Sequence, residues 1–318
     1  MKRIDLQTAA ARLLEAPAVR ILAHSHPDGD TLGSAYALAH ALRALGKDVR
    51  MLCEDPSPAM FAYMAEGLEE AERGDALVVS VDVAEESLLG RSLAAAYGGR
   101  IGLNIDHHGT NGLYAIENLI DAEACACSEI IGSLLDAMGI TMTAHIAACI
   151  YAGISTDTGC FRYANTTARS HLWAARCMDL GVDTEPLDRA FFETETKTYL
   201  ALERMAFDGL RYYCGGRVAL VAVTQEMFRQ SGSNEEEYIK LVARTRQIEG
   251  VLVGVAIREK EDGSFKISMR SHEPVDAAAV CARMGGGGHL RAAGAASDLP
   301  LEETIAMVVR CVEEELEG

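Results

Sequence analysis

Residues 101–109 read Ile101-Gly-Leu-Asn-Ile-Asp-His-His-Gly109, an apolar run that ends in one acid and two histidines. The run predicts a buried strand over 101–105, so that Asp106, His107 and His108 follow its carboxyl end. In open α/β sheets, ligands bind in the crevice at this end of the strands. Three consecutive ionisable side chains cannot all face a core, because side chains alternate along a strand and buried unpaired polar groups are costly. For this stretch alone, a solvated turn whose histidines have no function is the alternative.

The chain around this stretch alternates between predicted strands and predicted helices. The strands are expected at 19–23, 49–53, 76–81 and 101–105, and the helices at 5–16, 31–45, 128–138, 144–154 and 167–180. This alternation is typical of βαβ units, so the predicted fold class is α/β with an N-terminal doubly wound parallel sheet.

The length of 318 residues favours two domains. The composition becomes polar around 182–204, which places the boundary there: an N-terminal domain over 1–185, a connecting helix over 186–208 and a smaller C-terminal α/β domain over 209–318, with a cleft between the domains. In the second domain, strands are predicted at 218–223, 251–258 and 265–271, and helices at 234–247, 276–284 and 301–316.

Composition excludes several classes of protein. Charged residues interrupt the N-terminal segment and no apolar run approaches the length of a membrane span, so a cytoplasmic protein is expected. The nine cysteines lack CxxC spacing, which disfavours a zinc site or a disulfide framework. The net charge of −18 disfavours long nucleic acid as a partner, unless the substrate is small and its charge is met locally by bound cations.

The segment His24-Ser-His-Pro-Asp-Gly-Asp30 places three candidate metal ligands within one turn. Pro27 and Gly29 favour a turn over a regular helix, which lets His24, Asp28 and Asp30 converge. The alternative is that one of the acids caps the helix that follows, as aspartate often does. A cap requires only one acid and leaves His24 unexplained.

Further candidate ligands follow other buried runs, which gives a set of two imidazoles and four carboxylates. The set is His24, Asp28, Asp30, Asp82, His107 and Asp157. Four carboxylates at one sheet edge repel one another unless cations bind, and two divalent cations that share a carboxylate relieve this repulsion. More carboxylate than imidazole favours Mn²⁺ over Mg²⁺ or Zn²⁺. A pair of such ions is typical of phosphoryl hydrolysis.

The stretch Met284-Gly-Gly-Gly-Gly-His289 is the strongest signal in the second domain. Glycines expose backbone N–H groups and permit close approach to a phosphate or a base, although a flexible surface linker is the alternative. A helix-like stretch is expected after them. Arg270 and Ser271 at a strand end add a guanidinium, which offers paired donors to phosphate.

These motifs, together with Asp157-Thr-Gly, resemble the DHH phosphoesterases over nearly the whole chain, and more narrowly the stand-alone nanoRNase/pAp-phosphatase type and its relatives that cleave cyclic di-AMP. The resemblance implies two Mn²⁺ ions held by the six residues named above, with Asp82 as the bridge. It implies a catalytic role for His108 beside the metals. Substrate would be bound by a DHH-associated C-terminal domain through Arg270, Ser271, Gly287, Gly288 and His289. A homodimer is expected by resemblance alone.

The expected activity is hydrolysis of short oligoribonucleotides or of small nucleotides such as pAp and pApA to mononucleotides, with Asp82 and His108 as catalytic residues. A cyclic di-AMP phosphodiesterase is one alternative, and a catalytically inactive nucleotide sensor is an alternative of another class. The order of preference among these substrates does not follow from the sequence. Asn111 is a further candidate near the metals, whereas His40 and His145, on predicted helices without an acid at ligand spacing, are expected to have no role in the site.

Overall fold

The computed structural model describes residues 1–68 and 76–317, and the chain forms two compact units, Met1–Thr194 and Glu195–Gly318. The division falls inside the segment 186–208, where one connecting helix was expected. That expectation is wrong: the segment contains the end of α7 (Thr184–Asp188), the π-helical turn η3 (Arg189–Glu193) and α8 (Lys197–Asp208). The break arises because Thr196 is extended and its hydroxyl accepts the backbone N–H of Tyr199, which begins a new helix.

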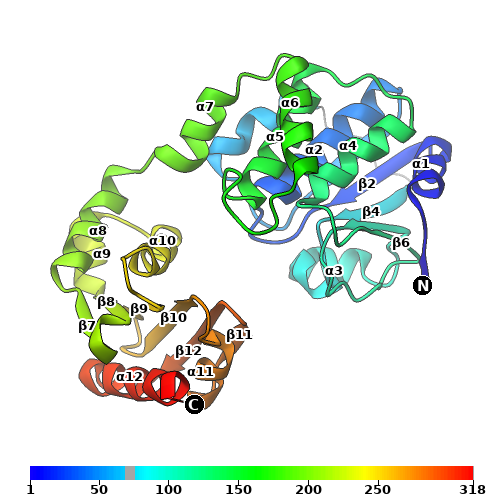
Figure 1. Ribbon diagram of the computed structural model, residues 1–318. Coiled ribbons are helices and arrows are strands. Elements are labelled where there is room, and N and C mark those ends of the chain that lie inside the picture. Colours follow the sequence, from blue (N-terminus) through cyan, green and yellow to red (C-terminus); the bar gives the residue numbers. More distant parts are fainter. Residues whose placement is uncertain (69–75, 318) are drawn as a thin grey trace. The chain divides into compact units, whose positions relative to one another are not determined.

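The first unit contains a six-stranded sheet in the order β1-β6-β5-β4-β2-β3. Figure 1 labels β2, β4 and β6 of this sheet. Its strands are β1 (Lys2–Arg3), β2 (Ala18–Leu22), β3 (Asp48–Leu52), β4 (Leu77–Val81), β5 (Leu103–Asp106) and β6 (Glu117–Ile120). All the pairings are parallel. The predicted α/β class with a parallel sheet is therefore confirmed. The short strands β1 and β6 had not been predicted.

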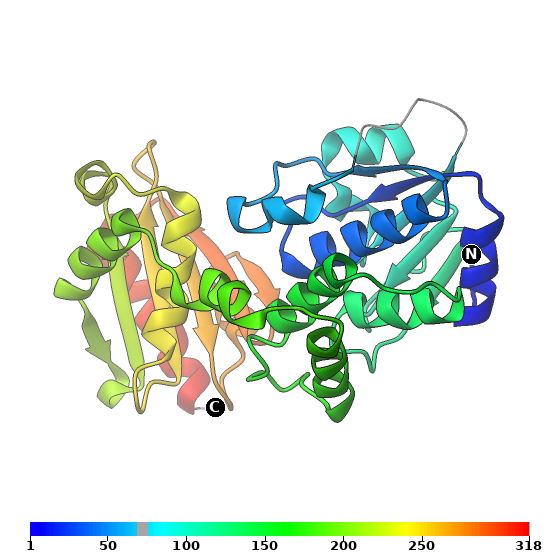
Figure 2. The same cartoon turned by 90° about the horizontal axis from the view of Figure 1, so that it is seen from above.

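Helices cover both faces of this sheet (Figure 2). The elements are α1 (Leu6–Glu15), α2 (Gly29–Ala44), α3 (Arg91–Tyr97), α4 (Cys127–Ala137), α5 (Ala144–Asp157) and α6 (Ala168–Asp179), with 3-10 turns η1 (Ala59–Ala65) and η2 (Glu86–Leu89). Ile21 and Val79 pack with α2, α4 and α5, whereas Leu22 and Val78 pack with residues of η2 and α3. α2 and α5 approach closely at Gly33, where a Cβ would lie 2.4 Å from the carbonyl oxygen of Cys149. This contact fixes the relative position of two helices whose ends carry predicted ligands.

The second unit is built on a sheet in the order β11-β12-β10-β9-β8-β7, which is antiparallel except for the parallel pair β8 and β9. Its strands are β7 (Arg211–Tyr213), β8 (Val218–Val223), β9 (Val253–Glu259), β10 (Phe265–Ser271), β11 (Gly287–His289) and β12 (Ala292–Ser297), with a 3-10 turn η4 (Cys214–Gly216) after β7. The stretch after the glycines, expected to be helical, is the strand β12. Its alternating burial against β10 outweighs the helix propensity of its alanines.

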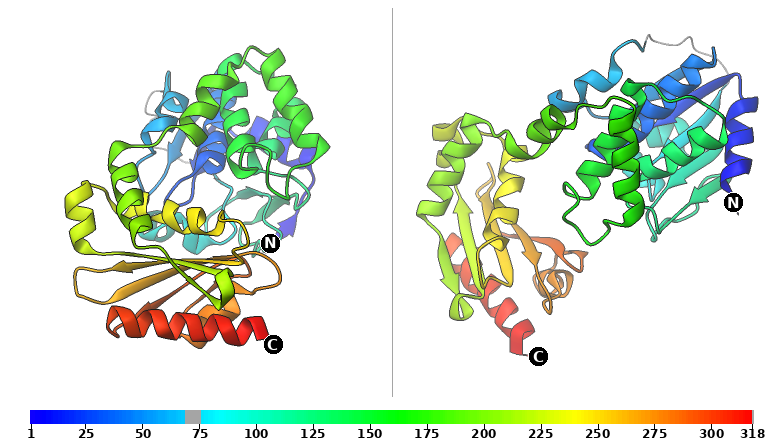
Figure 3. Two further views of the ribbon diagram at one scale, coloured as in Figure 1. Left: turned by 60° about the vertical axis from the view of Figure 1, so that its left-hand side comes forward. Right: turned by 45° about the horizontal axis from the view of Figure 1, so that its top comes forward.

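The remaining helices of this unit cover the two faces of its sheet (Figure 3). They are α9 (Gln225–Ser231), α10 (Glu235–Arg246), α11 (Ala277–Arg283) and α12 (Leu301–Glu317). α12 packs with Val255 and Ile267, and α8 and α10 pack with Ala256 on the opposite face. Within residues 1–68 and 76–317, no helix is both long enough and apolar enough to span a membrane.

Candidate metal centre

The predicted ligands of the first unit come together at the carboxyl end of its parallel sheet. His24 follows β2, Asp82 follows β4 and His107 follows β5. Asp28 and Asp30 lie at the start of α2, and Asp157 is the last residue of α5. Parallel strands direct their carboxyl ends to one edge, so residues far apart in the sequence meet there.

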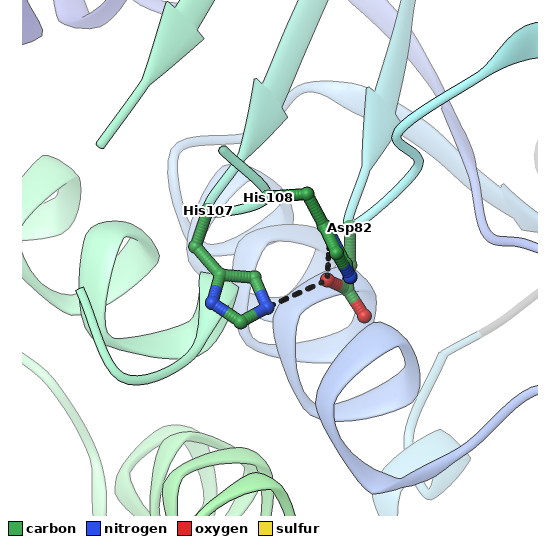
Figure 4. Close-up of side chains that lie close together, drawn as sticks. All are labelled: Asp82, His107 and His108. Atoms are coloured by element: carbon green, nitrogen blue, oxygen red, sulfur yellow. Dashed lines mark ion pairs between the residues drawn. The ribbon is translucent and has the colours of Figure 1, made fainter. Parts of the chain in front are cut away.

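His107 faces three of the carboxylates. Its Nε2 atom lies 3.5 Å from Asp82 Oδ1 (Figure 4). It also lies 3.8 Å from Asp30 Oδ2. The same nitrogen lies 3.8 Å from Asp157 Oδ2. The ligand atoms of Asp30, His107 and Asp157 lie within 4.8 Å of one another, which is a spacing that one cation could fill.

His24 defines a second group of the same kind. Its Nε2 atom lies 3.6 Å from Asp28 Oδ1 and 3.7 Å from Asp82 Oδ2. These three residues also place ligand atoms within 4.8 Å of one another. Asp82 therefore presents one carboxylate oxygen to His24 and the other to His107. Its position between the two groups suits a carboxylate that two cations share.

Asp82 is the carboxylate of this cluster whose surroundings most favour a bound cation. It is buried, and its Oδ1 atom has no hydrogen-bond partner among the described residues. Burial, followed by the charges of Asp30 and Asp28, raises the pKa of Asp82 well above its usual value. The backbone at Asp82 is left-handed (φ +58°), a conformation that an aspartate tolerates better than most residues. A buried oxygen without a donor beside two imidazoles fits a bound metal ion, so the residues present match the group that the motifs imply.

Asp30 receives its support from the beginning of α4. The backbone N–H groups of Cys127 and Ser128 donate to its two oxygens at 2.6 and 2.9 Å, and the Ser34 hydroxyl donates at 3.3 Å. Burial still raises the pKa of Asp30, although the nearby His107 opposes this effect. The N-terminal end of α4 thus stabilises the negative charge of Asp30. The sequence around Cys127 gave no signal of this contact.

Asp28 is placed both to cap the helix that follows and to act as a metal ligand, the two roles considered from the sequence. Its Oδ1 atom accepts the backbone N–H groups of Asp30 and Thr31, each at 3.0 Å, so Asp28 caps α2. The same carboxylate faces His24. Burial opposes ionisation of Asp28, but the nearby His24 and the backbone N–H groups of Thr31 and Asp30 together outweigh it and lower the pKa of Asp28. The cap holds the carboxylate in place for a ligand role and does not exclude that role.

The Asp157 side chain is 32% exposed, which is more than Asp30 and Asp82 but less than Asp28. Burial, and then the charge of Asp30, raise the pKa of Asp157 to about 7. The Asn165 side-chain amide donates to the Asp157 carboxylate at 3.2 Å and also to the Cys125 carbonyl at 2.9 Å. Asn165 was not predicted as a site residue. It links the loop after α5 to the loop before α4 and thereby orients Asp157.

His108 is held by Asp106, a contact that was not predicted from the sequence. Its Nδ1 atom lies 2.7 Å from Asp106 Oδ1, and the other Asp106 oxygen accepts the Asn111 side-chain amide at 2.6 Å. Burial opposes ionisation of Asp106, but the hydrogen bond and charge of His108, together with the hydrogen bond from Asn111, outweigh it and lower the pKa of Asp106. The bond to Asp106 in turn raises the pKa of His108. Asp106 and Asn111 are therefore positioning residues for the His108 ring, which points toward Asp82 in Figure 4.

The candidate substrate residues of the second unit differ in their exposure. Gly287, Gly288 and His289 form β11 and are exposed. Arg270 is partly buried and donates from Nη1 to the Met269 carbonyl at 3.0 Å. Ser271 is buried, and its hydroxyl donates to the Val275 carbonyl at 2.8 Å. In this structure the Ser271 hydroxyl is engaged inside the unit and is not presented to a ligand.

Two histidines expected to have no role in the site form a pair of their own. His40 and His145, on α2 and α5, bring their Nε2 atoms to 3.1 Å, and His40 Nε2 also lies 2.8 Å from the Met64 carbonyl oxygen. Burial, and to a smaller degree His145, lower the pKa of His40. The pair joins α2 and α5, and neither histidine belongs to a group of candidate metal ligands among the described residues.

Comparison with known proteins agrees with this architecture. Residues 18–154 match the DHH family, N-terminal domain, and residues 216–317 match the DHHA1 domain. The fold and the carboxylate–histidine cluster therefore define the class of two-domain DHH phosphoesterases.

The bifunctional oligoribonuclease and PAP phosphatase NrnA of Thermus thermophilus is 34% identical over 99% of this chain and 95% of its own length. The NrnA of Bacillus subtilis is 27% identical over 86% of this chain and 88% of its own length. The chain belongs to the NrnA family of DHH proteins. An exopolyphosphatase-related protein from Bacteroides fragilis has the same fold, with a TM-score of 0.87 and 22% identity over 97% of this chain and 95% of that one.

Proposed function

We propose that this protein hydrolyses short oligoribonucleotides and small nucleotides such as pAp and pApA to mononucleotides. The observation that carries the proposal is Asp82, whose buried Oδ1 atom has no hydrogen-bond donor among the described residues and faces both His107 and His108. Such a centre binds metal and acts on phosphate esters. Full-length similarity to proteins named oligoribonuclease and PAP phosphatase supports the substrate class.

The proposed cofactor is a pair of Mn²⁺ ions. Asp30, His107 and Asp157 would hold one ion, His24 and Asp28 would hold the other, and Asp82 would contact both. The donor set of two imidazoles and four carboxylates fits Mn²⁺ better than Mg²⁺, which seldom takes histidine. When bound, these ions supply Lewis-acid charge at the phosphoryl oxygens and lower the pKa of water.

His108 is proposed to protonate the leaving sugar oxygen. Asp106 accepts from Nδ1 and thereby fixes the ring, so Nε2 is the atom left to face the substrate. Asn111 holds Asp106 in turn. A ring that is oriented before substrate binds loses less freedom in the transition state, and the reaction proceeds faster for that reason.

Arg270, Gly287, Gly288 and His289 are proposed to bind the nucleotide through the second unit, with Ser271 holding the end of β10 in place. The exposed glycines leave the backbone open to close approach by a base or a phosphate. The net charge of −18 repels long nucleic acid and favours a small substrate. A cytoplasmic location is proposed from the sequence and a homodimer from the family resemblance, and analytical ultracentrifugation tests the dimer.

The test is a set of initial rates with Mn²⁺ on pAp, pApA, a five-nucleotide RNA, cyclic di-AMP and pyrophosphate, with Asp82→Asn as the blank. Release of AMP from pAp or from the short RNA, abolished in the variant, is the expected result. Turnover of cyclic di-AMP alone would replace the proposed substrate by the alternative. Metal binding without turnover of any compound would point to a nucleotide sensor.

A further inference from the structure

One backbone carbonyl beside the metal centre accepts more hydrogen bonds than its burial requires. The carbonyl oxygen of Val83, the residue after Asp82, accepts from the Asn104 amide at 2.9 Å, the Tyr114 hydroxyl at 3.0 Å and the Asn111 amide at 3.3 Å. A carbonyl oxygen has two lone pairs, so one donor is enough to satisfy it when it is buried. Three donors from separate side chains instead fix where this oxygen lies. Neither Asn104 nor Tyr114 was predicted as a site residue.

The backbone on the other side of Asp82 is held by β5, the strand that also carries Asn104. The Asp82 N–H donates to the Ile105 carbonyl at 2.9 Å, which continues the pairing of β4 with β5. Asp82 therefore lies between two fixed peptide groups, and its backbone is left-handed, with φ at +58°. Such a conformation persists where the surrounding contacts determine it. Because β5 leads directly into His107, this clamp of the Ile105 carbonyl and the donors to Val83 sets the Asp82 carboxylate relative to the His107 ring.

The hydrogen bonds of Asn104 differ from those of its neighbour across the sheet. Asn104 is in register with Asn118 of β6, and both residues are fully buried. Asn118 uses both ends of its amide, because Oδ1 accepts the Ala115 N–H at 3.3 Å and Nδ2 donates to the Ala115 carbonyl at 2.9 Å. Asn104 uses Nδ2, but its Oδ1 atom is buried without a hydrogen-bond partner among the described residues. An unsatisfied buried oxygen lowers stability, so stability alone does not account for an asparagine at this position.

Tyr114 reaches the same carbonyl from the loop before β6. Its hydroxyl donates to the Val83 carbonyl and lies 2.9 Å from the hydroxyl of Ser80 on β4. Because a tyrosine hydroxyl has a single hydrogen to donate, Ser80 is the donor to Tyr114. The strands β4 and β5 and this loop thus all help to hold one oxygen atom.

We propose that Asn104 and Tyr114 are positioning residues, which fix the Val83 carbonyl and thereby hold the Asp82 carboxylate between the two cation positions. The inference rests on the proposed metal centre. Without the clamp, the Asp82 carboxylate would turn away from Asp28, whose ligand oxygen lies within 4.8 Å and repels it. The clamp opposes this movement, so the shared ligand is in place before a cation binds and loses less freedom on binding.

Isothermal titration with Mn²⁺ compares the wild type with Asn104→Leu, Tyr114→Phe and the matched control Asn118→Leu. Leucine has nearly the shape of asparagine but lacks the donor, and it also removes the unpartnered Oδ1 atom. Asn104→Leu should bind Mn²⁺ roughly 10–100-fold more weakly, which is typical of losing a group that supports a metal ligand, while the midpoint of urea unfolding in EDTA changes little. Tyr114→Phe should weaken Mn²⁺ binding by a smaller factor. Asn118→Leu should show the opposite pattern, a lower midpoint at unchanged Mn²⁺ affinity.

A second measurement tests the clamp without metal. In EDTA, Asp82→Asn relieves the repulsion among the carboxylates and raises the midpoint of unfolding, as long as the clamp keeps this side chain close to the others. The increase should be smaller in the Asn104→Leu background and complete in the Asn118→Leu background.

Two results would overturn the positioning role: equal increases in both backgrounds, or a Mn²⁺ affinity that Asn104→Leu lowers no more than Asn118→Leu does. A wild type that binds no Mn²⁺ would overturn the proposed cofactor instead, and the measurement in EDTA would still decide the role of Asn104. Tyr114→Phe takes the place of Asn104→Leu in both measurements if the leucine variant does not fold.

Discussion

Replacement of Asp82 by asparagine should stabilise the metal-free protein while it abolishes activity. The side chains are nearly isosteric, so the main change is the loss of one buried negative charge. The ligand atoms of Asp82 and Asp28 lie within 4.8 Å of one another. Two unit charges at such a separation repel by about 3 kcal/mol at an effective dielectric constant of about 20, and by about 1 kcal/mol in water. We expect Asp82→Asn to raise the free energy of unfolding by about 1–3 kcal/mol in EDTA at pH 8.

The sign of the pH dependence follows from the raised pKa of Asp82. A carboxyl whose pKa is higher in the folded than in the unfolded state contributes most to stability below its unfolded value of 3.8, and the contribution falls as the pH rises toward the folded value. Metal-free wild type should therefore lose stability as the pH rises from 4, and Asp82→Asn should lose less. Thermal melts in EDTA measure the difference, which is expected at roughly 2–4 °C per kcal/mol for a unit of this size.

Titration with Mn²⁺ should make the wild type more stable than Asp82→Asn, the reverse of the order in EDTA. A cation replaces the repulsion by attraction in the wild type, whereas the variant lacks the shared ligand and gains less. The prediction also has a matched control in Asp55→Asn, because Asp55 contacts His26 outside the cluster. A variant that is less stable than the wild type in EDTA, or that gains as much from Mn²⁺, would refute the reasoning that Asp82 lies between two cation positions.

Three further predictions concern residues around this centre and in the second unit. His108→Gln should lower kcat by about 10²–10⁴-fold. Asp106→Asn should lower kcat less, at nearly unchanged KM, because Asp106 acts only through the ring of His108. Steady-state rates on pAp test both variants. The pKa of His40 lies below 6.5 in the folded state, so the folded state is favoured above that pH and loses stability as the pH falls through it. Urea melts between pH 5 and 8 should therefore show a free energy of unfolding that depends less on pH in His40→Gln. Ser271→Ala should lower the free energy of unfolding by about 0.5–1.5 kcal/mol, the net contribution of one hydrogen bond, because the Val275 carbonyl still accepts from Arg291. KM for pAp should be unchanged, and a higher KM at full stability would instead make Ser271 a substrate contact.

Much of the metal centre could be predicted because its residues stand at the ends of apolar runs. Asp82 follows a run over 76–81 and His107 follows one over 101–105. Parallel strands bring their carboxyl ends to one edge of the sheet irrespective of the conformation of the loops. The contacts that support the ligands were not predictable. Asp30 accepts hydrogen bonds from Cys127 and Ser128, which are 97 and 98 residues away, and a helix N-terminus has no side-chain signature when its own backbone is the donor.

In the second unit, the local pattern was misleading in two places. The alanine-rich stretch after Gly288 is typical of a helix, but pairing with β10 makes it the strand β12, because long-range hydrogen bonds outweigh local propensity. Residues 186–208 resemble one helix, but extended backbone between Thr194 and Thr196 divides them. In both cases the competing interaction involves partners or backbone angles that the local sequence does not display.

By itself, then, the sequence determined the alternation of the main strands and helices in the first unit, the polar residues that follow these strands and the family to which they belong. Those features depend on periodicity and on residue type, which are local. Tertiary structure alone decided that Asp82 is buried without a donor, that Asp106 holds His108, and that Asn104 and Tyr114 hold the Val83 carbonyl. These contacts join residues from separate elements, and their distances are set by how helices and strands pack, which no local pattern encodes.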